Sequence, residues 1–229
     1  MEAFRCGKRH SSLFWGKGEI MIKNILLDVG MVLVDFRWQD VMKEIGLSGN
    51  TLEIVADATV RSQAWNEYDR SVKPDEEVLS SFLVAAIDKQ EQVRLFWEQV
   101  GRTIVQYPYA KAWIASMKKA GYHVYILSNY ARRTYELTKD QGLDFLPLVD
   151  GAVFSFQTGY IKPEKEIYHF ILDQFRLVSK ECVFIDDTVR NLAYPKEIGI
   201  HTIRFRSFSQ AQEELRALGV SLADLKDLA

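Results

Sequence analysis

The chain has 229 residues, which at about 150 residues per domain corresponds to one or two domains. Hydrophobic residues make up 48% and charged residues 26%, a balance that excludes a disordered chain, a collagen-like fibre and a disulfide-stapled miniprotein. The 29 Lys and Arg residues against 31 Asp and Glu residues give a formal net charge of −2, so we expect neither nucleic acid nor a membrane surface as a partner.

Residues 1–20 are predicted to lie outside the fold. They carry four basic residues but no continuous apolar run, so they are not typical of a signal peptide, and the stretch from Met21 is typical of a protein start. No window approaches the roughly 18 consecutive apolar residues of a membrane helix. Cys6 and Cys182 form no CxxC pair. Reduced thiols in a cytoplasmic protein are the simpler interpretation, and one isolated disulfide is the alternative.

Four short apolar runs are predicted to be buried strands of a parallel sheet, in which continuous hydrophobicity replaces alternation. They are Ile22–Leu27, Tyr122–Leu127, Val183–Ile185 and His201–Phe205. Between the later strands, the predicted helices are Ala110–Lys119, ending at Gly121; Pro163–Phe175, with Pro163 in its first turn; and Thr188–Ile198, ending at Gly199. This alternation predicts an α/β fold with a doubly wound, Rossmann-like parallel sheet.

The region from residue 37 to residue 107 interrupts the alternation. It contains no strand-like run, and its apolar positions have helical spacing. The predicted helices are Gln39–Ile45, Thr51–Arg61, Pro74–Ile87 and Glu91–Gln106. A single crossover helix needs far fewer residues. We therefore predict an α/β core formed by residues 21–36 and 108–229, with residues 37–107 inserted as an all-helical cap over the sheet.

Polar side chains follow the predicted strands, at the edge of an open α/β sheet where ligands bind. Taken singly, each has an ordinary explanation as a helix cap, a turn residue or a solvated surface lysine. Taken together, several carboxylates at one edge would repel each other unless they bind a cation, and hard oxygen ligands favour Mg²⁺. A lysine and a serine beside the cation are suited to hold a phosphate, which indicates phosphoryl transfer to a carboxylate. The residues are Asp28, Ser128, Asn129, Lys162, Asp186 and Asp187.

The order of these residues along the chain separates two phosphate-handling families. Response-regulator receivers have the acidic pair first, whereas here the order is Asp28, Ser128, Lys162 and then Asp186-Asp187. This order resembles that of the haloacid dehalogenase (HAD) superfamily, whose four motifs fall at the same places over about residues 21–207. The insert resembles the type 1 cap of HAD subfamily I. The stretches YILSN, GYIKPEKEIY and CVFIDDTVRN resemble the branch that includes sugar-1-phosphate phosphatases and the N-terminal phosphatase domain of soluble epoxide hydrolase.

The resemblance implies a role for each residue at a matching position. Asp28 would be the nucleophile, attacking phosphorus to form an aspartyl-phosphate that water then hydrolyses. Mg²⁺ would be held by Asp28, the backbone carbonyl of Gly30 and Asp187, with Asp186 in the outer shell or contributing through water. Asp187 is favoured as the direct ligand because the second acid of the pair usually aligns there.

The remaining matching residues are implied to bind the phosphoryl group. Ser128 and Lys162 would hold it and stabilise its charge during transfer. Asn129 belongs to the same phosphate-binding group, and we expect Asn129 and Asn191 mainly to orient loops and neighbouring side chains. The predicted function is a Mg²⁺-dependent phosphatase acting on a small phosphorylated metabolite, with sugar phosphates among the candidates.

One position departs from the family pattern. Most HAD phosphatases have a second Asp two residues after the nucleophile, acting as general acid and base, and here that residue is Gly30. Asp35 lies seven residues past Asp28 and cannot be assumed to replace it. Two explanations stay open: the leaving group needs little protonation, as in an anomeric sugar phosphate, or the cap supplies an acid.

The alternative function is a catalytically weak HAD-like domain that binds a phosphorylated ligand or partner. A haloacid dehalogenase fits poorly, because that chemistry uses no Mg²⁺.

Other candidate features carry less weight. The four histidines have no metal-ligand spacing, so a zinc site is not expected. In the cap, the segment 65–70 could face the substrate, with Trp65 or Arg70 as the contact, or it could serve helix packing. Gly151 and Gly159 are predicted turn residues. The sequence makes no prediction of oligomeric state.

Overall fold

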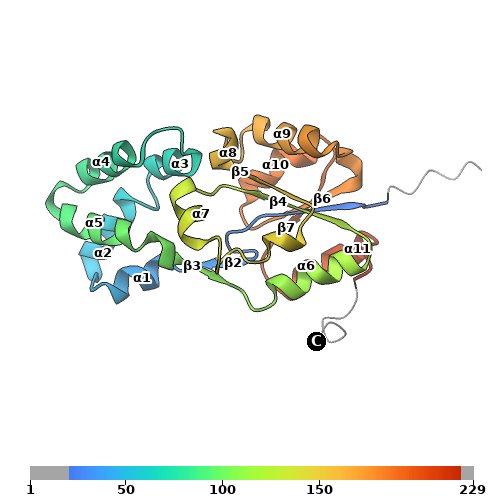
Figure 1. Ribbon diagram of the computed structural model, residues 1–229, viewed down its shortest axis with the longest axis horizontal. Helices are drawn as coiled ribbons and strands as arrows, with labels where there is room; N and C mark the ends of the chain where they lie inside the picture. The colour runs from blue at the N-terminus through green and yellow to red at the C-terminus, as the bar shows by residue number, and fades with distance from the viewer. Residues whose placement is uncertain (1–20, 223–229) are drawn as a thin grey trace, which may run out of the picture.

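The computed structural model describes residues 21–222, so the predictions for residues 1–20 and for Cys6 lie outside the described residues. At its centre is a five-stranded parallel sheet with the order β5-β4-β1-β6-β7 (Figure 1). The strands are β1 (Asn24–Leu27), β4 (His123–Ser128), β5 (Gly151–Phe154), β6 (Cys182–Asp186) and β7 (His201–Arg204). Four of them match the predicted runs, and the predicted α/β fold with a parallel sheet is confirmed.

Helices cover both faces of the sheet, because successive residues of a strand point to opposite sides. In β1, Ile25 and Leu27 belong to one apolar cluster and Leu26 belongs to another. The first cluster includes residues of α6 and α11, and the second includes residues of α9 and α10. Figure 1 shows the two pairs on opposite sides of the sheet. Their bounds are α6 (Ala110–Lys119), α9 (Lys165–Phe175), α10 (Val189–Glu197) and α11 (Phe208–Ala217).

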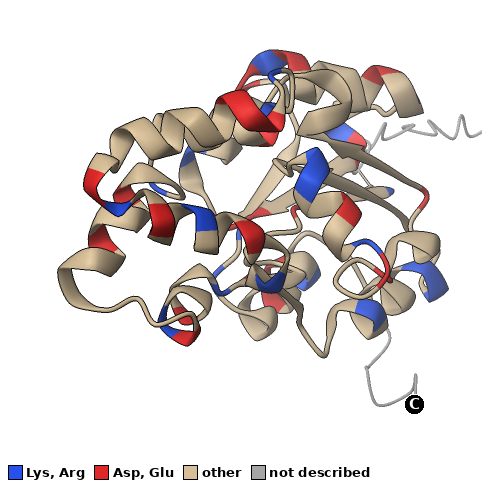
Figure 2. Ribbon diagram, turned by 60° about the vertical axis from the view of Figure 1, so that its left-hand side comes forward, with Lys and Arg blue, Asp and Glu red and all other residues tan. Residues whose placement is uncertain are grey.

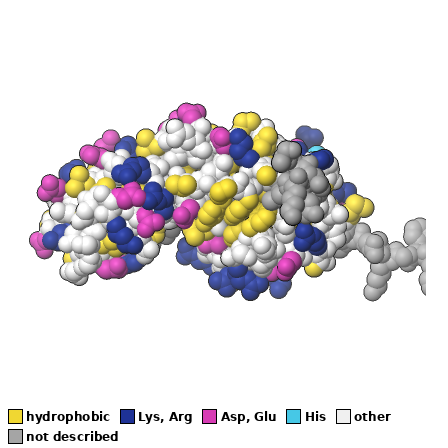
Figure 3. Space-filling model, turned by 90° about the horizontal axis from the view of Figure 1, so that it is seen from below, with side chains coloured by type: hydrophobic (Ala, Val, Ile, Leu, Met, Phe, Trp, Pro, Cys, Tyr) yellow, Lys and Arg dark blue, Asp and Glu magenta, His cyan; other side chains and the backbone are white. Residues whose placement is uncertain are grey.

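A helical insert stands beyond the carboxyl ends of the strands (Figure 1). It packs around its own apolar cluster, which includes Val55, Tyr68, Phe82 and Phe96. Acidic and basic side chains are interspersed over its surface (Figures 2 and 3). No helix within residues 21–222 is long and apolar enough to cross a membrane. The insert contains α1 (Trp38–Glu44), α2 (Gly49–Ala58), α3 (Gln63–Arg70), α4 (Asp75–Ala85), η1 (Ile87–Lys89), α5 (Gln90–Glu98) and η2 (Val100–Thr103).

Two short antiparallel strands join the insert to the core: β2 (Val34–Phe36) and β3 (Ile104–Gln106). The prediction that residues 37–107 contain no strand is therefore wrong. The prediction of one helix over Glu91–Gln106 is also wrong, because α5 ends at Glu98 and a 3₁₀ turn precedes β3. Residues 103–105 are all β-branched, and such side chains fit a strand better than a helix.

Strand β5 is absent from the predicted strands, because the sequence suggests Gly151 as a turn residue. In the structure Gly151 pairs with Tyr125 of β4. A Cβ atom at Gly151 would lie 2.3 Å from the ring of Phe175, so glycine here leaves room for an aromatic side chain of α9. A glycine inside a strand often marks such a close approach. Gly159 does lie in a turn, with a positive φ of 75° at the end of α8 (Ser155–Thr158).

The loop before α9 differs from the prediction in a way that matters for the site. Helix α9 begins at Lys165, so Pro163 is not in its first turn. Instead the backbone N–H of Glu164 donates to the carbonyl of Ile161 at 2.8 Å, and the Glu164 carboxylate accepts from the Ile161 N–H at 3.0 Å. These two bonds close a turn that fixes the backbone on both sides of Lys162.

The other elements of the core are α7 (Arg132–Thr138), which follows β4, and the short 3₁₀ turns η3 (Leu146–Leu148) and η4 (Ser179–Glu181). Helix α7 lies between the sheet and the insert (Figure 1). It is therefore placed to support both the end of β4 and the insert helices facing it.

Candidate functional site

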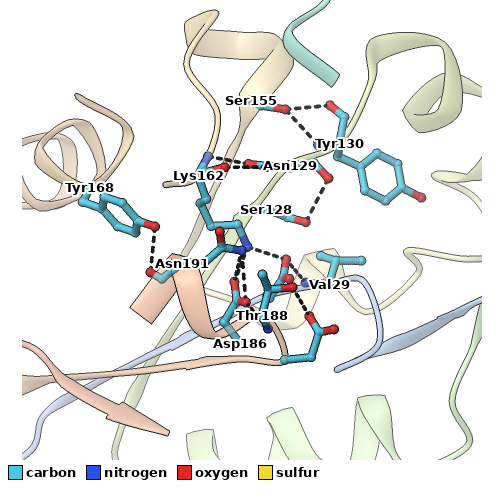
Figure 4. Close-up of polar contacts among 12 residues, drawn as sticks. Val29, Ser128, Asn129, Tyr130, Ser155, Lys162, Tyr168, Asp186, Thr188 and Asn191 are labelled. Atoms are coloured by element: carbon cyan, nitrogen blue, oxygen red, sulfur yellow. Dashed lines mark hydrogen bonds and ion pairs between the residues drawn. The ribbon is translucent and has the colours of Figure 1, made fainter. Parts of the chain in front are cut away.

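Polar residues meet where the central strands β4, β1 and β6 end. Asp28 follows β1, Ser128 ends β4, and Asp186 ends β6 with Asp187 directly after it. Lys162 comes from the loop between α8 and α9 and points to the same place (Figure 4). Because β1 lies between β4 and β6, residues far apart in sequence become neighbours. The structure thus brings together the predicted site residues.

Lys162 is the centre of this cluster. Its Nζ atom lies 2.8 Å from Oδ1 of Asp28 and 2.6 Å from Oδ2 of Asp186, and its side chain is only 1% exposed. The Nζ atom also lies 5.4 Å from the ring centroid of Phe184 on β6. The ordinary interpretation of Lys162 as a solvated surface lysine is therefore wrong. A buried ammonium group needs paired charges around it, and here two carboxylates supply them.

Asp186 is fully buried and its two oxygens are held from several sides. The backbone N–H of Thr188 donates to Oδ1 at 2.8 Å, and the Asn191 amide donates to both oxygens at 3.1 Å. The Asn191 backbone carbonyl in turn accepts from the Tyr168 hydroxyl at 2.7 Å (Figure 4). Asp186 is therefore a fixed support for Lys162.

Asp187 differs from its neighbour in the acidic pair. It is partly exposed and lines a cavity, and its carboxylate accepts the Thr188 hydroxyl at 3.3 Å. Its oxygens are therefore more accessible than those of Asp186, which lie inside a network of donors.

Asn129 holds the backbone of the lysine loop. Its Nδ2 atom donates to the Lys162 carbonyl at 3.0 Å, and its Oδ1 atom accepts from the Lys162 N–H at 2.7 Å (Figure 4). This pair of bonds agrees with the expectation that Asn129 orients a loop. Ser128 is buried beside Asp28, and its hydroxyl acts to lower the pKa of that carboxyl group.

The electrostatics of the cluster follow from burying like charges together. Burial raises the pKa of Asp28 to about 7; the charge of Lys162 opposes this shift and that of Asp186 adds to it. Burial and the charge of Asp186 also raise the pKa of Asp187. For Lys162, burial alone would lower the pKa, but the attraction of Asp186 and Asp28 outweighs burial and raises it. The lysine is therefore charged at neutral pH, and the acids share more negative charge than one ammonium group neutralises.

A cation would relieve this excess, and the donor set fits Mg²⁺. One oxygen each from Asp28, Asp186 and Asp187 lie within 4.8 Å of one another. Carboxylate oxygens are the ligands that Mg²⁺ prefers, and it binds through one or two of them while keeping several waters. Gly30 lines the adjacent cavity, so its backbone is also close to this cluster.

A cavity of about 360 Å³ opens between the acidic cluster and the helical insert. Its volume is that of a site for a small organic ligand. The side of the cavity nearest the insert and the strands β2 and β3 is largely apolar, and the side nearest the sheet is polar. The lining residues are Asp28, Gly30, Met31, Phe36, Val60, Trp65, Asp69, Ile104, Asn129, Tyr130, Ala131, Thr134, Asp187, Thr188 and Arg190.

The two candidate contacts in the cap differ in position. Trp65 lines the cavity, and it also stacks on Phe82 at a ring-centroid distance of 6.0 Å, so it combines the two roles considered for it. Arg70 does not line the cavity. Its guanidinium group pairs with Glu164 and donates to the Gly159 carbonyl at 3.1 Å, which ties α3 to the core.

Two charged residues of the cavity, Asp69 and Arg190, were not among the predicted site residues. A signal for Asp69 exists in the sequence, because Trp65 and Asp69 are four residues apart and so lie on one face of a helix. That signal requires the helix α3 to be recognised first. Its start is marked by Ser62, whose side chain accepts the Trp65 N–H at 3.3 Å.

A parallel sheet with an acidic cluster at its carboxyl edge, covered by a helical insert, defines the chain as an α/β enzyme whose site lies between the two parts. The chain belongs to the haloacid dehalogenase-like hydrolase family, whose model matches residues 22–199. The predicted family is therefore confirmed, and the protein is a hydrolase.

Individual relatives support the family assignment. The chain is 24% identical over 216 residues to the D-ribitol-5-phosphate phosphatase of Bacteroides thetaiotaomicron, a match that covers 86% of this chain and 98% of that one. It is 35% identical over 112 residues to the bifunctional epoxide hydrolase 2 of Rattus norvegicus, covering 44% of this chain and 19% of that protein. Among solved structures, one that is similar in fold is a HAD family enzyme from Bacteroides thetaiotaomicron in complex with magnesium and inorganic phosphate. Its TM-score is 0.64, its sequence is 20% identical, and the match covers 83% of this chain and 98% of that one.

Proposed function

We propose that the protein is a Mg²⁺-dependent phosphatase that hydrolyses a small phosphorylated metabolite, with sugar and sugar-alcohol phosphates as the first candidates. The observation that carries this proposal is the buried Lys162, held between Asp28 and Asp186 beside the partly exposed Asp187. A relative whose match covers 86% of this chain is named for a phosphatase activity on a sugar-alcohol phosphate, and the size of the cavity is compatible with such a substrate.

In this proposal Asp28 is the nucleophile. Its carboxylate attacks the phosphorus atom, the bond to the leaving oxygen breaks, and the phosphoryl group is carried on Asp28 until water releases it. Lys162 and Ser128 hold the phosphoryl oxygens and stabilise the charge that develops on them. Asn129 fixes the lysine loop, and Asp186 keeps the ammonium group of Lys162 in place.

Mg²⁺ would be held by Asp28, the Gly30 carbonyl and Asp187. Asp186 would lie in the outer shell or contribute through water. The accessible carboxylate of Asp187 supports its assignment as a direct ligand over Asp186, whose oxygens are occupied by Lys162, Thr188 and Asn191. Bound there, Mg²⁺ would neutralise the charge of the transferring phosphoryl oxygens.

Magnesium is expected to stabilise the folded protein independently of activity, because it relieves repulsion among the three acids. At tenfold its dissociation constant, a ligand of the native state adds about 1.4 kcal/mol, or about 3–6 °C in Tm for a chain of this size. Thermal melts with and without MgCl₂ measure this shift. Asp187→Asn is expected to abolish most of it, and the matched control Asp144→Asn, at an exposed ion pair with Lys111, to keep it. An equal shift in all three proteins would contradict the assigned site.

The phosphatase proposal is tested by release of inorganic phosphate from p-nitrophenyl phosphate and from a panel of sugar, sugar-alcohol, nucleotide and acyl phosphates. The expected result is turnover that requires Mg²⁺ and is lost in Asp28→Asn. Saturable binding of phosphorylated compounds without turnover would support the alternative of a weak, ligand-binding HAD domain, which Gly30 favours. Fluoride release from fluoroacetate would instead support a dehalogenase.

The expected partners and location of the protein stay predictions. The balanced charge of the sequence supports the expectation of no nucleic-acid partner. A cytoplasmic location rests on the sequence alone.

A further inference from the structure

The position two residues after Asp28 is glycine, so the site lacks a carboxyl group at the place where most family members carry their acid–base residue. In the described part of the structure, too, the space beside Gly30 holds no carboxyl group in place of the missing one. Among the described residues, 21–222, a Cβ atom built on Gly30 meets no heavy atom within 4 Å apart from its two chain neighbours, so the space has room for a side chain. Another group must therefore protonate the leaving oxygen and deprotonate water, or the reaction proceeds without positioned help.

We propose that Asp69, on helix α3 of the insert, is the general acid and base of this enzyme. The inference rests on the proposed phosphatase function and extends it, because it assigns the proton-transfer role that Gly30 leaves open. Asp69 lines the same cavity as Asp28 and Gly30 but approaches from the insert side. A leaving group bound in the cavity would therefore lie between the nucleophile and Asp69.

The side chain of Asp69 has no structural task of its own. Within the part of the chain that the structure describes, its carboxylate takes part in no hydrogen bond or ion pair, whereas its neighbours Glu67 and Arg70 are both in ion pairs. The carboxyl group of this half-buried residue is therefore free to interact with a molecule bound in the cavity that it lines. Such a residue is explained more readily by a reaction in the cavity than by stability.

The backbone around Asp69 is anchored to the core at three consecutive residues. The Tyr68 hydroxyl is hydrogen-bonded to the Thr134 hydroxyl at 2.8 Å, and Arg70 pairs with Glu164. Between them, the carbonyl of Asp69 itself accepts the Ser155 hydroxyl at 2.6 Å. Ser155 also accepts the Tyr130 N–H at 2.8 Å, directly after Ser128 and Asn129 (Figure 4). These bonds fix the backbone of Asp69 relative to the sheet edge, which limits where its carboxyl group can lie in the cavity, as an acid–base residue requires.

The surroundings of Asp69 suit proton transfer near neutral pH. Burial of its carboxyl group and the charge of Asp28 together raise its pKa to about 8, against the opposing charge of Lys162. An acid with a pKa near the working pH can both donate and accept a proton during turnover. The raised pKa of Asp69 therefore agrees with an acid–base role, which its position in the cavity and the three bonds around its backbone already support.

Two proton transfers by Asp69 complete the reaction. A carboxylate oxygen of Asp28 forms a bond to phosphorus while the bond from phosphorus to the leaving oxygen breaks, and the proton of the Asp69 carboxylic acid passes to that oxygen. The alcohol leaves. The Asp69 carboxylate then takes a proton from water, whose oxygen attacks phosphorus, and the bond from phosphorus to Asp28 breaks. Phosphate is released and Asp69 is again protonated.

The test compares the unmutated protein with Asp69→Asn, on p-nitrophenyl phosphate and phenyl phosphate in the presence of MgCl₂. Because kcat/KM reports the steps up to departure of the alcohol, it isolates the acid role. We expect Asp69→Asn to lower kcat/KM by about 10²–10³-fold for phenyl phosphate and by less than about tenfold for p-nitrophenyl phosphate, whose leaving group needs no proton. Acid quenching of the variant should also show more phosphorylated Asp28 than in the unmutated protein, because water activation is slowed.

Two further variants separate a catalytic role from a structural one. Glu67→Gln, on the same helix but paired with Arg70 and Lys73 away from the cavity, is expected to keep both rates. Adding Gly30→Asp to Asp69→Asn is expected to recover at least about tenfold of the lost phenyl phosphate activity, because the open space at Gly30 accepts a carboxyl group in the family's usual place. Purely structural damage at Asp69 would not be repaired from the end of β1.

These measurements distinguish an error in the proposed phosphatase function from an error in the role of Asp69. If the unmutated protein releases no phosphate in a Mg²⁺-dependent manner, both are wrong. If it is active and Asp69→Asn leaves the rates unchanged, or lowers them equally for both aryl phosphates without rescue by Gly30→Asp, then the phosphatase function stands and the role of Asp69 is wrong.

Discussion

Asp28→Asn is expected to reduce phosphate release by about 10³-fold or more, because the amide cannot form the covalent intermediate. The fold is expected to persist, and the Tm to stay equal or rise, because the substitution removes one of three clustered carboxylates. Initial rates and thermal melts on the same preparation measure both effects.

The matched control for this substitution is Asp35→Asn. Asp35 lies on β2, in the connection to the insert, where it is paired in register with Val105. This variant is expected to keep most of the activity. Residual activity of more than about one tenth in Asp28→Asn, or an equal loss in Asp35→Asn, would contradict the assignment of the nucleophile.

Lys162→Met is expected to have the largest effect on stability. The methionine fits the apolar stem of the lysine, but it leaves Asp28 and Asp186 buried without the cation that lies 2.8 Å and 2.6 Å from them. Breaking a buried ion pair from one side costs about 3–5 kcal/mol. Urea unfolding measures this loss, and phosphatase activity should disappear with it, because the phosphoryl group loses its main protein cation.

Magnesium distinguishes this electrostatic cause from poor packing. The stability lost in Lys162→Met should be partly restored by MgCl₂, because a bound cation again neutralises the acids. Lys165→Met, three residues along and exposed at the start of α9, is the control and should be close to neutral. A Lys162→Met protein as stable as the unmutated chain would show that the buried ion pairs do not have the assigned role.

The parallel sheet is predictable from the sequence because its strands are covered on both faces. Ile25, Leu26 and Leu27 alternate between two apolar clusters, so the strand has one continuous hydrophobic run. Strand β5 is not predictable in this way, since its glycine is explained by the ring of Phe175, which comes from a helix later in the chain. The strand β3 does carry a local signal, the β-branched residues 103–105, which the prediction of one helix over Glu91–Gln106 overlooks.

The candidate site is predictable for a different reason. Parallel strands bring their carboxyl ends to one edge, so the positions of Asp28, Ser128 and Asp186 after apolar runs are enough to group them. The depth of burial of Lys162 and its simultaneous contact with two acids depend instead on the turn around Ile161 and Glu164, which the sequence pattern does not reveal.

Sequence reasoning indicates the segment 65–70 as one that could face the substrate but does not single out Asp69, because its place in the cavity depends on how α3 docks on the core. That docking is set by contacts between the insert and the loops after β4 and β5, among them the bonds from Tyr68 to Thr134 and from Ser155 to the Asp69 carbonyl. Such contacts join residues more than sixty positions apart, so no local pattern predicts them.

The most direct test of the proposed function is to trap the covalent intermediate. The protein is mixed with a turned-over phosphate monoester and MgCl₂, quenched in acid within the first turnovers, and digested with trypsin for mass spectrometry. The peptide Asn24–Arg37 is predicted to gain the mass of one phosphoryl group, located by fragmentation on Asp28 and absent from Asp28→Asn. Steady phosphate release with no phosphoryl group on Asp28 at any quench time, or with the group on another residue, would contradict the proposed mechanism.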